Sequence, residues 1–380
     1  MKILVAAPGF DSREKHEVSI FALDQAKALR DAGHDVRFAA IDTRSIRRFR
    51  PWGLYRYKLD GIPVYYSSIP CGTLPLNLPA LTGRMAASKI CRTIAKDGWK
   101  PDIVHAHFLG VAAIVAPVCW ENGLPLVITE HTSAINSPNP GTALVKTMRK
   151  TYPLADALLA VSSLLANNIY LSTGARARVV PNIIDTQNFC AVRVRKNCAE
   201  DGSFCFAASG FLIERKGYDL LLRAVGELHR KGYALTLTIF GDGAERENLE
   251  KQAEVESIRD FVDFRGQCSR KELGEAYAQM DAFVLPSRRE TFGVVYIEAM
   301  AVGLPVIATR CGGPEDFVTE ENGILIPVDD VQALTDAMEY MILHRNEYNS
   351  TKISENTRRQ FAPETIAAQL TEVYKEVLSC

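Results

Sequence analysis

The sequence has almost no net charge and few of the features that define several large protein classes. Its 44 Lys and Arg residues nearly balance its 45 Asp and Glu residues, so composition gives no support for nucleic-acid binding. The nine cysteines form no C-x-x-C pair, and those in apolar surroundings, such as Cys119 and Cys205, are typical of small buried hydrophobes. The first apolar run is too short for a signal peptide, and no stretch is long enough to span a bilayer. We therefore expect a chain in a reducing compartment, the cytoplasm.

Two cofactor patterns are also missing. The first strand-like segment is not followed by G-x-G-x-x-G, which argues against a bound NAD. No D-x-D pair occurs, so a metal ion bridging a diphosphate is not indicated. We therefore expect no resident cofactor and no metal site.

What is present is an alternation of strand-like and helix-like segments in both halves of the chain. A length of 380 residues exceeds a usual single core, so two domains are expected. The alternation predicts an α/β protein with two Rossmann-like, doubly wound domains. A polar stretch after residue 190 places the boundary between the domains nearby.

Residues 281–328 hold the densest set of signals. Residues 282–285 are an apolar run that ends at a proline, which is typical of a buried parallel strand, and residues 294–301 have the character of a helix. Gly293 at the start of that helix leaves backbone N–H groups uncovered, which predicts a phosphate site. Glu290 lies just before the helix and Glu298 about two turns inside it. The alternative, two solvated surface glutamates, does not account for their coincidence with the strand and the Phe-Gly pair.

The pattern E-x-F-G-x-x-x-x-E, followed by A-M-A-x-G-x-P-V-I-A-T, resembles the E-x7-E signature of retaining GT-B glycosyltransferases, closest to glycosyltransferase family 4 (the group 1 glycosyltransferases). The resemblance implies two domains that face each other across a cleft. It implies that Glu290 contacts the transferred sugar, that Glu298 contacts the nucleotide ribose, and that the backbone of Phe292, Gly293 and Val294 holds the diphosphate. It also implies that the last helix returns to the first domain, giving domains of residues 1–188 with 362–380, and 189–361.

A second loop carries basic residues. The segment from Ser209 to Gly217 resembles the family pattern G-R-L-x-x-x-K-G, whose Arg and Lys bind the donor phosphates. Lys216 matches that lysine, but Phe211 occupies the arginine position, and Arg215 is the candidate to supply the missing charge. Read without the resemblance, Arg215 and Lys216 would be ordinary surface charges. Gly266 ends a V-x-F-x-G strand that contacts the nucleotide base in relatives.

The N-terminal half offers histidines at predicted strand ends. His131 follows an apolar strand, where ligands of parallel sheets bind, and in relatives the matching histidine contacts the sugar. His105 and His107 share one face of a strand, and we expect a pocket wall or a structural role because no third metal ligand lies nearby. The first strand is expected to turn at Gly9 and Phe10. Relatives often have two glycines in this loop, which contact the acceptor or the diphosphate, whereas this chain has one. Gly9 and Phe10 are therefore candidates for acceptor contacts.

Residues 44–58, from Arg44 to Lys58, are the most basic part of the chain and include four aromatic residues. Two interpretations stay open. The segment contacts anionic lipid on the inner face of the membrane or a phosphorylated acceptor, or it is a solvated loop and strand edge.

Together these features predict a metal-independent retaining transferase that moves a hexose-type sugar from a UDP- or GDP-sugar to a hydroxyl of a glycan or lipid-linked acceptor. A role in bacterial surface polysaccharide or glycoconjugate synthesis fits many relatives. The alternatives are a GT-B nucleotide-sugar 2-epimerase and a non-catalytic nucleotide-sugar-binding protein.

Overall fold

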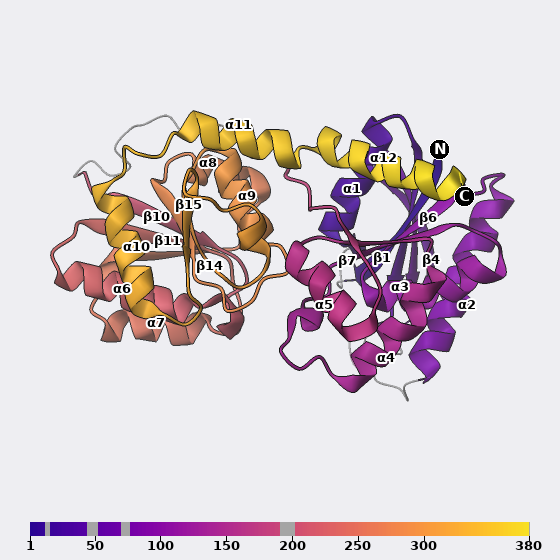
Figure 1. The fold of residues 1–380 in the computed structure, drawn as a ribbon, viewed down its shortest axis with the longest axis horizontal. Helices are drawn as coiled ribbons and strands as arrows, with labels where there is room; N and C mark the ends of the chain where they lie inside the picture. The colour runs from indigo at the N-terminus through magenta and orange to yellow at the C-terminus, as the bar shows by residue number, and fades with distance from the viewer. Residues whose placement is uncertain (12–15, 44–51, 70–76, 191–201, 380) are drawn as a thin grey trace. The chain divides into compact units, whose positions relative to one another are not determined.

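The computed structural model describes residues 1–11, 16–43, 52–69, 77–190 and 202–379. The chain divides into two compact units (Figure 1). Unit 1 contains Met1–Ile183 and Pro363–Cys380, and unit 2 contains Ile184–Ala362. Among the described residues, no helix combines the length and the apolar character that crossing a bilayer requires.

Unit 1 is built on a sheet with the strand order β4-β5-β3-β1-β6-β7-β8-β9, in which β4 and the short β2 pair antiparallel to their neighbours. Its strands are β1 (Lys2–Asp11), β2 (His16–Val18), β3 (Asp35–Asp42), β4 (Gly53–Leu59), β5 (Ile62–Ser68), β6 (Ile103–His107), β7 (Leu126–Glu130), β8 (Ala157–Ala160) and β9 (Arg178–Val179). Its helices are α1 (Ile20–Asp31), α2 (Asn77–Lys96), α3 (Leu109–Glu121), α4 (Thr142–Thr151), α5 (Ser163–Thr173) and α12 (Pro363–Ser379).

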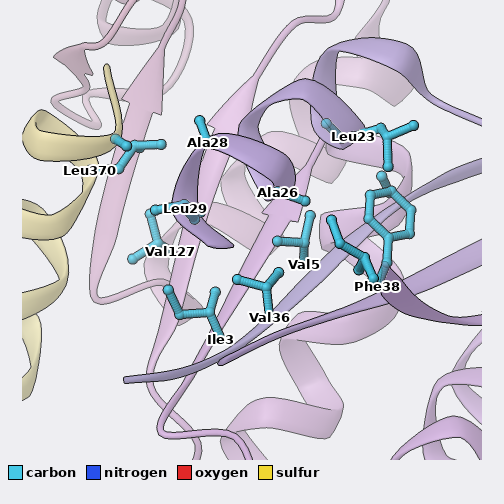
Figure 2. Packing of buried hydrophobic residues seen from close by; sticks show 14 of the residues in the cluster. Ile3, Val5, Leu23, Ala26, Ala28, Leu29, Val36, Phe38, Val127 and Leu370 are labelled. Carbon is cyan, nitrogen blue, oxygen red and sulfur yellow. The ribbon is translucent and has the colours of Figure 1, made fainter. Parts of the chain in front are cut away.

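The side chains of β1 alternate between two apolar layers. Ile3 and Val5 pack with α1 and α12, as Figure 2 shows with Leu29 and Leu370. Leu4 and Ala6 point to the other face of the sheet, where they line a small apolar cavity with residues of α2 and α3. Because both faces are covered, the central strands are continuous apolar runs, as the sequence predicted.

Unit 2 has a sheet in the order β12-β11-β10-β13-β14-β15, all of it parallel. Its strands are β10 (Phe204–Ser209), β11 (Leu235–Phe240), β12 (Val262–Gly266), β13 (Ala282–Leu285), β14 (Val306–Thr309) and β15 (Gly323–Ile326). Its helices are α6 (Tyr218–Arg230), α7 (Arg246–Val255), α8 (Arg270–Tyr277), α9 (Val294–Ala301), α10 (Val331–Leu343) and α11 (Ser350–Phe361). The predicted two Rossmann-like α/β domains are therefore confirmed.

The first strand differs from its prediction. The sequence predicted a turn at Gly9 and Phe10, but β1 continues through both residues and pairs antiparallel with β2, Gly9 opposite Val18. Gly9 is needed for packing instead, since a Cβ there would lie 2.7 Å from the ring of Tyr66. The prediction was wrong because the pairing with β2, a tertiary contact, extends the strand past its glycine.

The basic segment from Arg44 to Lys58 is only partly described. Residues 44–51 lie outside the described residues. The rest enters β4, where Arg56 pairs with Asp97 and Trp52 is exposed. The lipid or acceptor contact stays a prediction.

Helix α12 gives a test of the core of unit 1. Leu370 is fully buried against the sheet, whereas Leu378 on the same helix is 40% exposed. We expect Leu370→Ala to lower the free energy of unfolding of unit 1 by about 2–5 kcal/mol and Leu378→Ala by less than about 0.5 kcal/mol. All three tryptophans, Trp52, Trp99 and Trp120, belong to unit 1, so a urea titration followed by tryptophan fluorescence measures this unit alone. Equal effects of the two substitutions would contradict the packing.

Candidate active site

The carboxyl ends of parallel strands lie at one edge of a sheet, so in unit 2 the loops after β10, β11, β12 and β13 gather there. They are held by backbone hydrogen bonds. Gly210 N donates to Phe240 O at 3.0 Å, and Gly241 N donates to Gly266 O at 2.7 Å. This edge carries the residues that the sequence singled out.

A buried ion pair lies at the centre of this edge. Lys216 Nζ lies 2.6 Å from Glu290 Oε1, and the two side chains are 11% and 8% exposed. Ser287 Oγ donates to the same carboxylate oxygen at 2.8 Å. Burial raises the pKa of Tyr218, and the negative charge of Glu290 raises it further. A lysine and a glutamate that are 74 residues apart in sequence thus form one polar centre.

Glycine makes this pairing possible. Gly217 adopts a φ of +70°, and a Cβ there would lie 2.1 Å from the carbonyl oxygen of Pro286. The backbone that follows Lys216 therefore touches the end of β13. No other residue allows this approach, because the obstacle is backbone rather than a movable side chain.

The N-terminus of α9 opens beside Glu290. Gly293 begins the helix with a φ of +93°, and among the described residues no side chain caps it. Its first N–H groups and the helix dipole form an anion site. The side chain of Phe292 is 3% exposed and packs on Phe317 and Phe361, so only the backbone of this residue borders the site.

Glu298 lies deeper along α9 and is 6% exposed. Arg270 Nε lies 3.9 Å from its Oε1, and the same arginine reaches Asp185 at 3.4 Å. Glu298 also raises the pKa of Tyr277, although burial is the larger cause. The structure therefore gives the two predicted glutamates separate polar surroundings.

The remaining predicted donor residues lie on the flanking loops. Phe211 is 67% exposed and points its ring away from the core. Arg215 is partly exposed, and in the described part of the chain its side chain makes no ion pair. Gly266 ends β12 with a φ of +73°. Val294 is partly exposed at the first position of α9.

In unit 1 the histidines form one buried cluster. His107 Nδ1 and His131 Nε2 lie 3.1 Å apart, and the rings of Phe108 and Phe21 lie near the His131 ring, at centroid distances of 4.7 Å and 6.4 Å. His105 is bonded to Tyr374 of α12 at 2.6 Å and to Thr129 at 2.7 Å. Gly9 and Phe10 lie on β1, in the part of that strand that pairs with β2.

Burial keeps these imidazoles neutral. It lowers the pKa of His131 to about 3 and, with the nearby charge of His131, that of His105 to about 3. The pKa of His107 falls well below its usual value for the same reason. His107 Nε2 is buried and has no partner among the described residues. If His107 donates from Nδ1 to His131, the unsatisfied atom is a lone pair rather than an N–H, the less costly arrangement. His131 then carries its proton on Nδ1.

Glu130 holds the loop that carries His131. Its carboxylate accepts hydrogen bonds from the backbone of His131 at 2.9 Å, of Thr132 at 2.8 Å and of Leu109 at 3.3 Å, and from the Tyr152 hydroxyl at 3.0 Å. Burial raises the pKa of Glu130, and these hydrogen bonds oppose that effect. This network fixes the end of β7 to the start of α3.

Several of these partners were not identified from the sequence. Ser287, three residues before Glu290, and Glu130, which accepts from the next two backbone N–H groups, are the ones that local spacing could have revealed. Arg270 and Tyr218 act through tertiary contacts and leave no local signal. Within the described ranges, no group of three or more His, Cys, Asp or Glu side chains is arranged to hold a metal ion.

The histidine cluster predicts how the stability of unit 1 depends on pH. A histidine with a pKa lowered from 6.5 to about 3 in the folded state contributes stability above pH 6.5 that is lost as the pH falls toward 3. His105→Gln removes one such group. Between pH 6 and pH 5 we expect the wild-type free energy of unfolding to fall by about 1 kcal/mol more than that of His105→Gln. Urea titrations followed by tryptophan fluorescence measure both, and parallel curves would exclude the buried neutral imidazole.

Two family descriptions match the chain. "Glycosyl transferases group 1" matches residues 194–360, and "Glycosyltransferase Family 4" matches residues 18–188. A GDP-mannose-dependent alpha-mannosyltransferase of Mycobacterium tuberculosis is 32% identical over 345 residues, covering 84% of this chain and 82% of the relative. A putative teichuronic acid biosynthesis glycosyltransferase, TuaC of Bacillus subtilis, is 27% identical and covers 89% and 88%.

Solved structures share the fold. Sucrose-phosphate synthase from Thermosynechococcus elongatus superposes with a TM-score of 0.80 at 20% identity, covering 100% of this chain and 99% of that one. Anabaena Alr3699/HepE in complex with UDP and glucose gives a TM-score of 0.74 at 20% identity, covering 99% and 100%. The chain thus belongs to the group 1 glycosyltransferases of glycosyltransferase family 4 and is a glycosyltransferase with the GT-B fold.

Proposed function

We propose that this glycosyltransferase moves a hexose-type sugar from a UDP- or GDP-sugar to a hydroxyl of a glycan or lipid-linked acceptor, with retention of anomeric configuration and without a metal ion. The observation that carries the proposal is the buried Lys216–Glu290 pair beside the uncapped N-terminus of α9. A cation and a helix N-terminus suit a diphosphate, and a carboxylate suits sugar hydroxyls. One site then offers partners both for the diphosphate and for the sugar of a nucleotide-sugar.

The relatives support this donor class. The Mycobacterium relative is GDP-mannose-dependent, and Alr3699/HepE binds UDP and glucose. TuaC is named for teichuronic acid biosynthesis and a further relative, LpsE of Rhizobium meliloti, for the lipopolysaccharide core. These names favour a role in bacterial surface polysaccharide or glycoconjugate synthesis, in the cytoplasm.

In the proposed reaction, the bond between the anomeric carbon and the phosphate oxygen breaks and its electron pair goes to the diphosphate. Lys216 and the N–H groups of Val294 and its neighbour stabilise that charge as it develops. The acceptor hydroxyl forms the new bond on the same face of the sugar, and its proton passes to the leaving phosphate oxygen. Glu290 positions the sugar through its hydroxyls.

The other predicted residues receive supporting roles. Glu298 accepts from the nucleotide ribose, the Gly266 backbone borders the base, and Arg215 adds charge at the diphosphate in place of the family arginine lost at Phe211. His131 orients the sugar, with His107 fixing its ring. Gly9 and Phe10 remain low-weight candidates for the acceptor side.

Nucleotide release from UDP-, GDP- and ADP-sugars, followed with and without acceptor hydroxyls, tests the proposal. We expect release from one donor, with kcat/KM reduced about 100-fold to 1000-fold by Lys216→Met because a diphosphate partner is lost. Glu290→Gln should reduce it by a similar factor. Lys271→Met is the matched control. It replaces a lysine of α8 whose side chain is 76% exposed, and it should change kcat/KM by less than about twofold.

Breaking the buried pair also destabilises the fold, by about 3–5 kcal/mol, because it leaves an unpaired charge. The double variant Lys216→Met with Glu290→Gln removes both charges and should recover most of that stability without recovering activity. If the double variant recovered activity as well as stability, the Lys216–Glu290 pair would have only a structural role. Rearrangement of a donor to an isomer would instead favour the epimerase, and binding without turnover the non-catalytic alternative.

The stereochemical course can be followed separately. Proton NMR of the first-formed product should show the anomeric configuration of the donor, because attack and departure use the same face. Activity should persist after dialysis against EDTA, since Lys216 and α9 rather than a metal ion hold the diphosphate. An inverted product, or activity restored only by added metal, would contradict this part of the proposal.

A further inference from the structure

The helices α2, α3, α4 and α5 of unit 1 carry a strongly one-sided charge. Between them they contain seven cations and one acid, Glu121. The cations are Arg84, Lys89, Arg92 and Lys96 on α2, and Lys146, Arg149 and Lys150 on α4. The two helices on the other side of the sheet, α1 and α12, contain three cations and five acids. The imbalance is therefore local, since the whole chain has a net charge of −1.

These four helices form one layer. Each connects two parallel strands in the direction from β5 through β6, β7 and β8 to β9, with β3 and β1 lying between β5 and β6. Right-handed crossovers in one direction put their helices on one face of the sheet. Ala87 of α2 and Val118 of α3 pack with Leu4 and Ala6 of β1, on the face opposite α1 and α12. In Figure 1 the labels α3 and α4 lie on the side of the unit 1 sheet away from α1 and α12.

The outer surface of this layer combines apolar and basic side chains. On α2, Leu81 and Met85 are one turn apart and 55% and 62% exposed. The same exposed stripe continues along α2 with Lys89 and Arg92. Arg84 pairs with Glu121 of α3, so the one acid of the layer is neutralised and α2 is tied to α3.

Helix α3 has no charge on its outer surface before Glu121. Its residues that are at least partly exposed recur every three or four positions: Gly110, Ala113, Pro117 and Trp120. Trp120 is 73% exposed. A solvated helix usually carries charges on its outer surface. This uncharged stripe beside two basic helices therefore indicates a binding surface rather than one that faces only water.

We infer that the outer surface of α2, α3 and α4 docks the protein on a lipid bilayer that contains anionic lipid. Exposed leucine, methionine and tryptophan side chains enter the interfacial region, and the flanking cations meet phosphate headgroups. This goes beyond the proposed function and does not depend on the donor or the acceptor. It also uses a surface other than residues 44–58.

The chemistry favours lipid over other polyanions or a second copy of the chain. A nucleic acid would pair with the cations but would gain little from Leu81, Met85 and the small residues of α3. A second copy would present the same cations, and like charges would repel across the contact. An anionic bilayer satisfies both the cations and the apolar stripe.

Sedimentation with vesicles tests the inference on the full chain. We expect binding to phosphatidylcholine vesicles that contain about one third phosphatidylglycerol, weak or no binding to pure phosphatidylcholine, and a loss of affinity as salt is raised. Lys89→Gln with Arg92→Gln should weaken binding roughly tenfold. Equal binding to both kinds of vesicle would overturn the role of the cations.

The apolar part has its own matched pair. Met85→Ser with Lys89→Gln on α2 should weaken vesicle binding about tenfold, whereas Leu378→Ser with Lys375→Gln on α12 should change it less than about twofold. Both pairs replace one exposed apolar residue and one exposed lysine. Equal effects of the two pairs would mean that binding follows net charge alone and would overturn the docking surface.

Tryptophan fluorescence identifies the surface that enters the lipid. In a Trp52→Phe background, Trp99 is buried and Trp120 is the exposed reporter, so vesicles should shift its emission to the blue. A shift seen only in a Trp120→Phe background, where Trp52 reports, would assign docking to the region of residues 44–58 instead. Two other outcomes would also overturn the inference. One is that heparin competes with vesicles for the protein and binding leaves the Trp120 emission unshifted. The other is that the protein forms a dimer without lipid and that Met85→Ser converts this dimer to monomers.

Discussion

The site of unit 2 depends on close contact between backbone segments at the edge of its sheet. The chain after Lys216 lies against the carbonyl of Pro286, and a Cβ at Gly313 would lie 2.1 Å from the carbonyl oxygen of Phe292. Backbone atoms cannot rotate away as a side chain can, so these contacts fix the loops rigidly. The positions of Lys216, Glu290 and the start of α9 follow from that constraint.

Local patterns predicted much of this architecture. The helix at residues 294–301 and the strand at residues 282–285 have the bounds expected from their sequence, because an apolar run that ends at proline or glycine defines both. Gly9 was misplaced because strand pairing overrides a local turn signal. The bond from Tyr374 to His105 joins residues 269 positions apart, and no local pattern encodes it. Arg270, which reaches Glu298 and Asp185, escaped prediction for the same reason.

The distribution of surface charge was also difficult to predict from the sequence. The basic run from Arg44 to Lys58 is conspicuous in the sequence because six cations fall within 15 residues. The cations of α2 and α4 are spread from Arg84 to Lys150 and gather only when the crossovers bring these helices into one layer. A near-zero net charge therefore hides a dipolar unit, with a basic face on one side of the sheet and an acidic face on the other.

The buried pair of Lys216 and Glu290 has a consequence for selectivity. Each group is the counter-ion of the other, so neither charge is left unpaired in a dry environment. A simple anion such as inorganic phosphate must compete with an internal carboxylate for the lysine and would separate Glu290 from its counter-ion, leaving it the Ser287 hydroxyl. A molecule that offers a phosphate to Lys216 and hydroxyl donors to Glu290 replaces both partners at once. Under the proposed function, the pair would therefore act as an internal competitor that only a ligand with both groups displaces without loss.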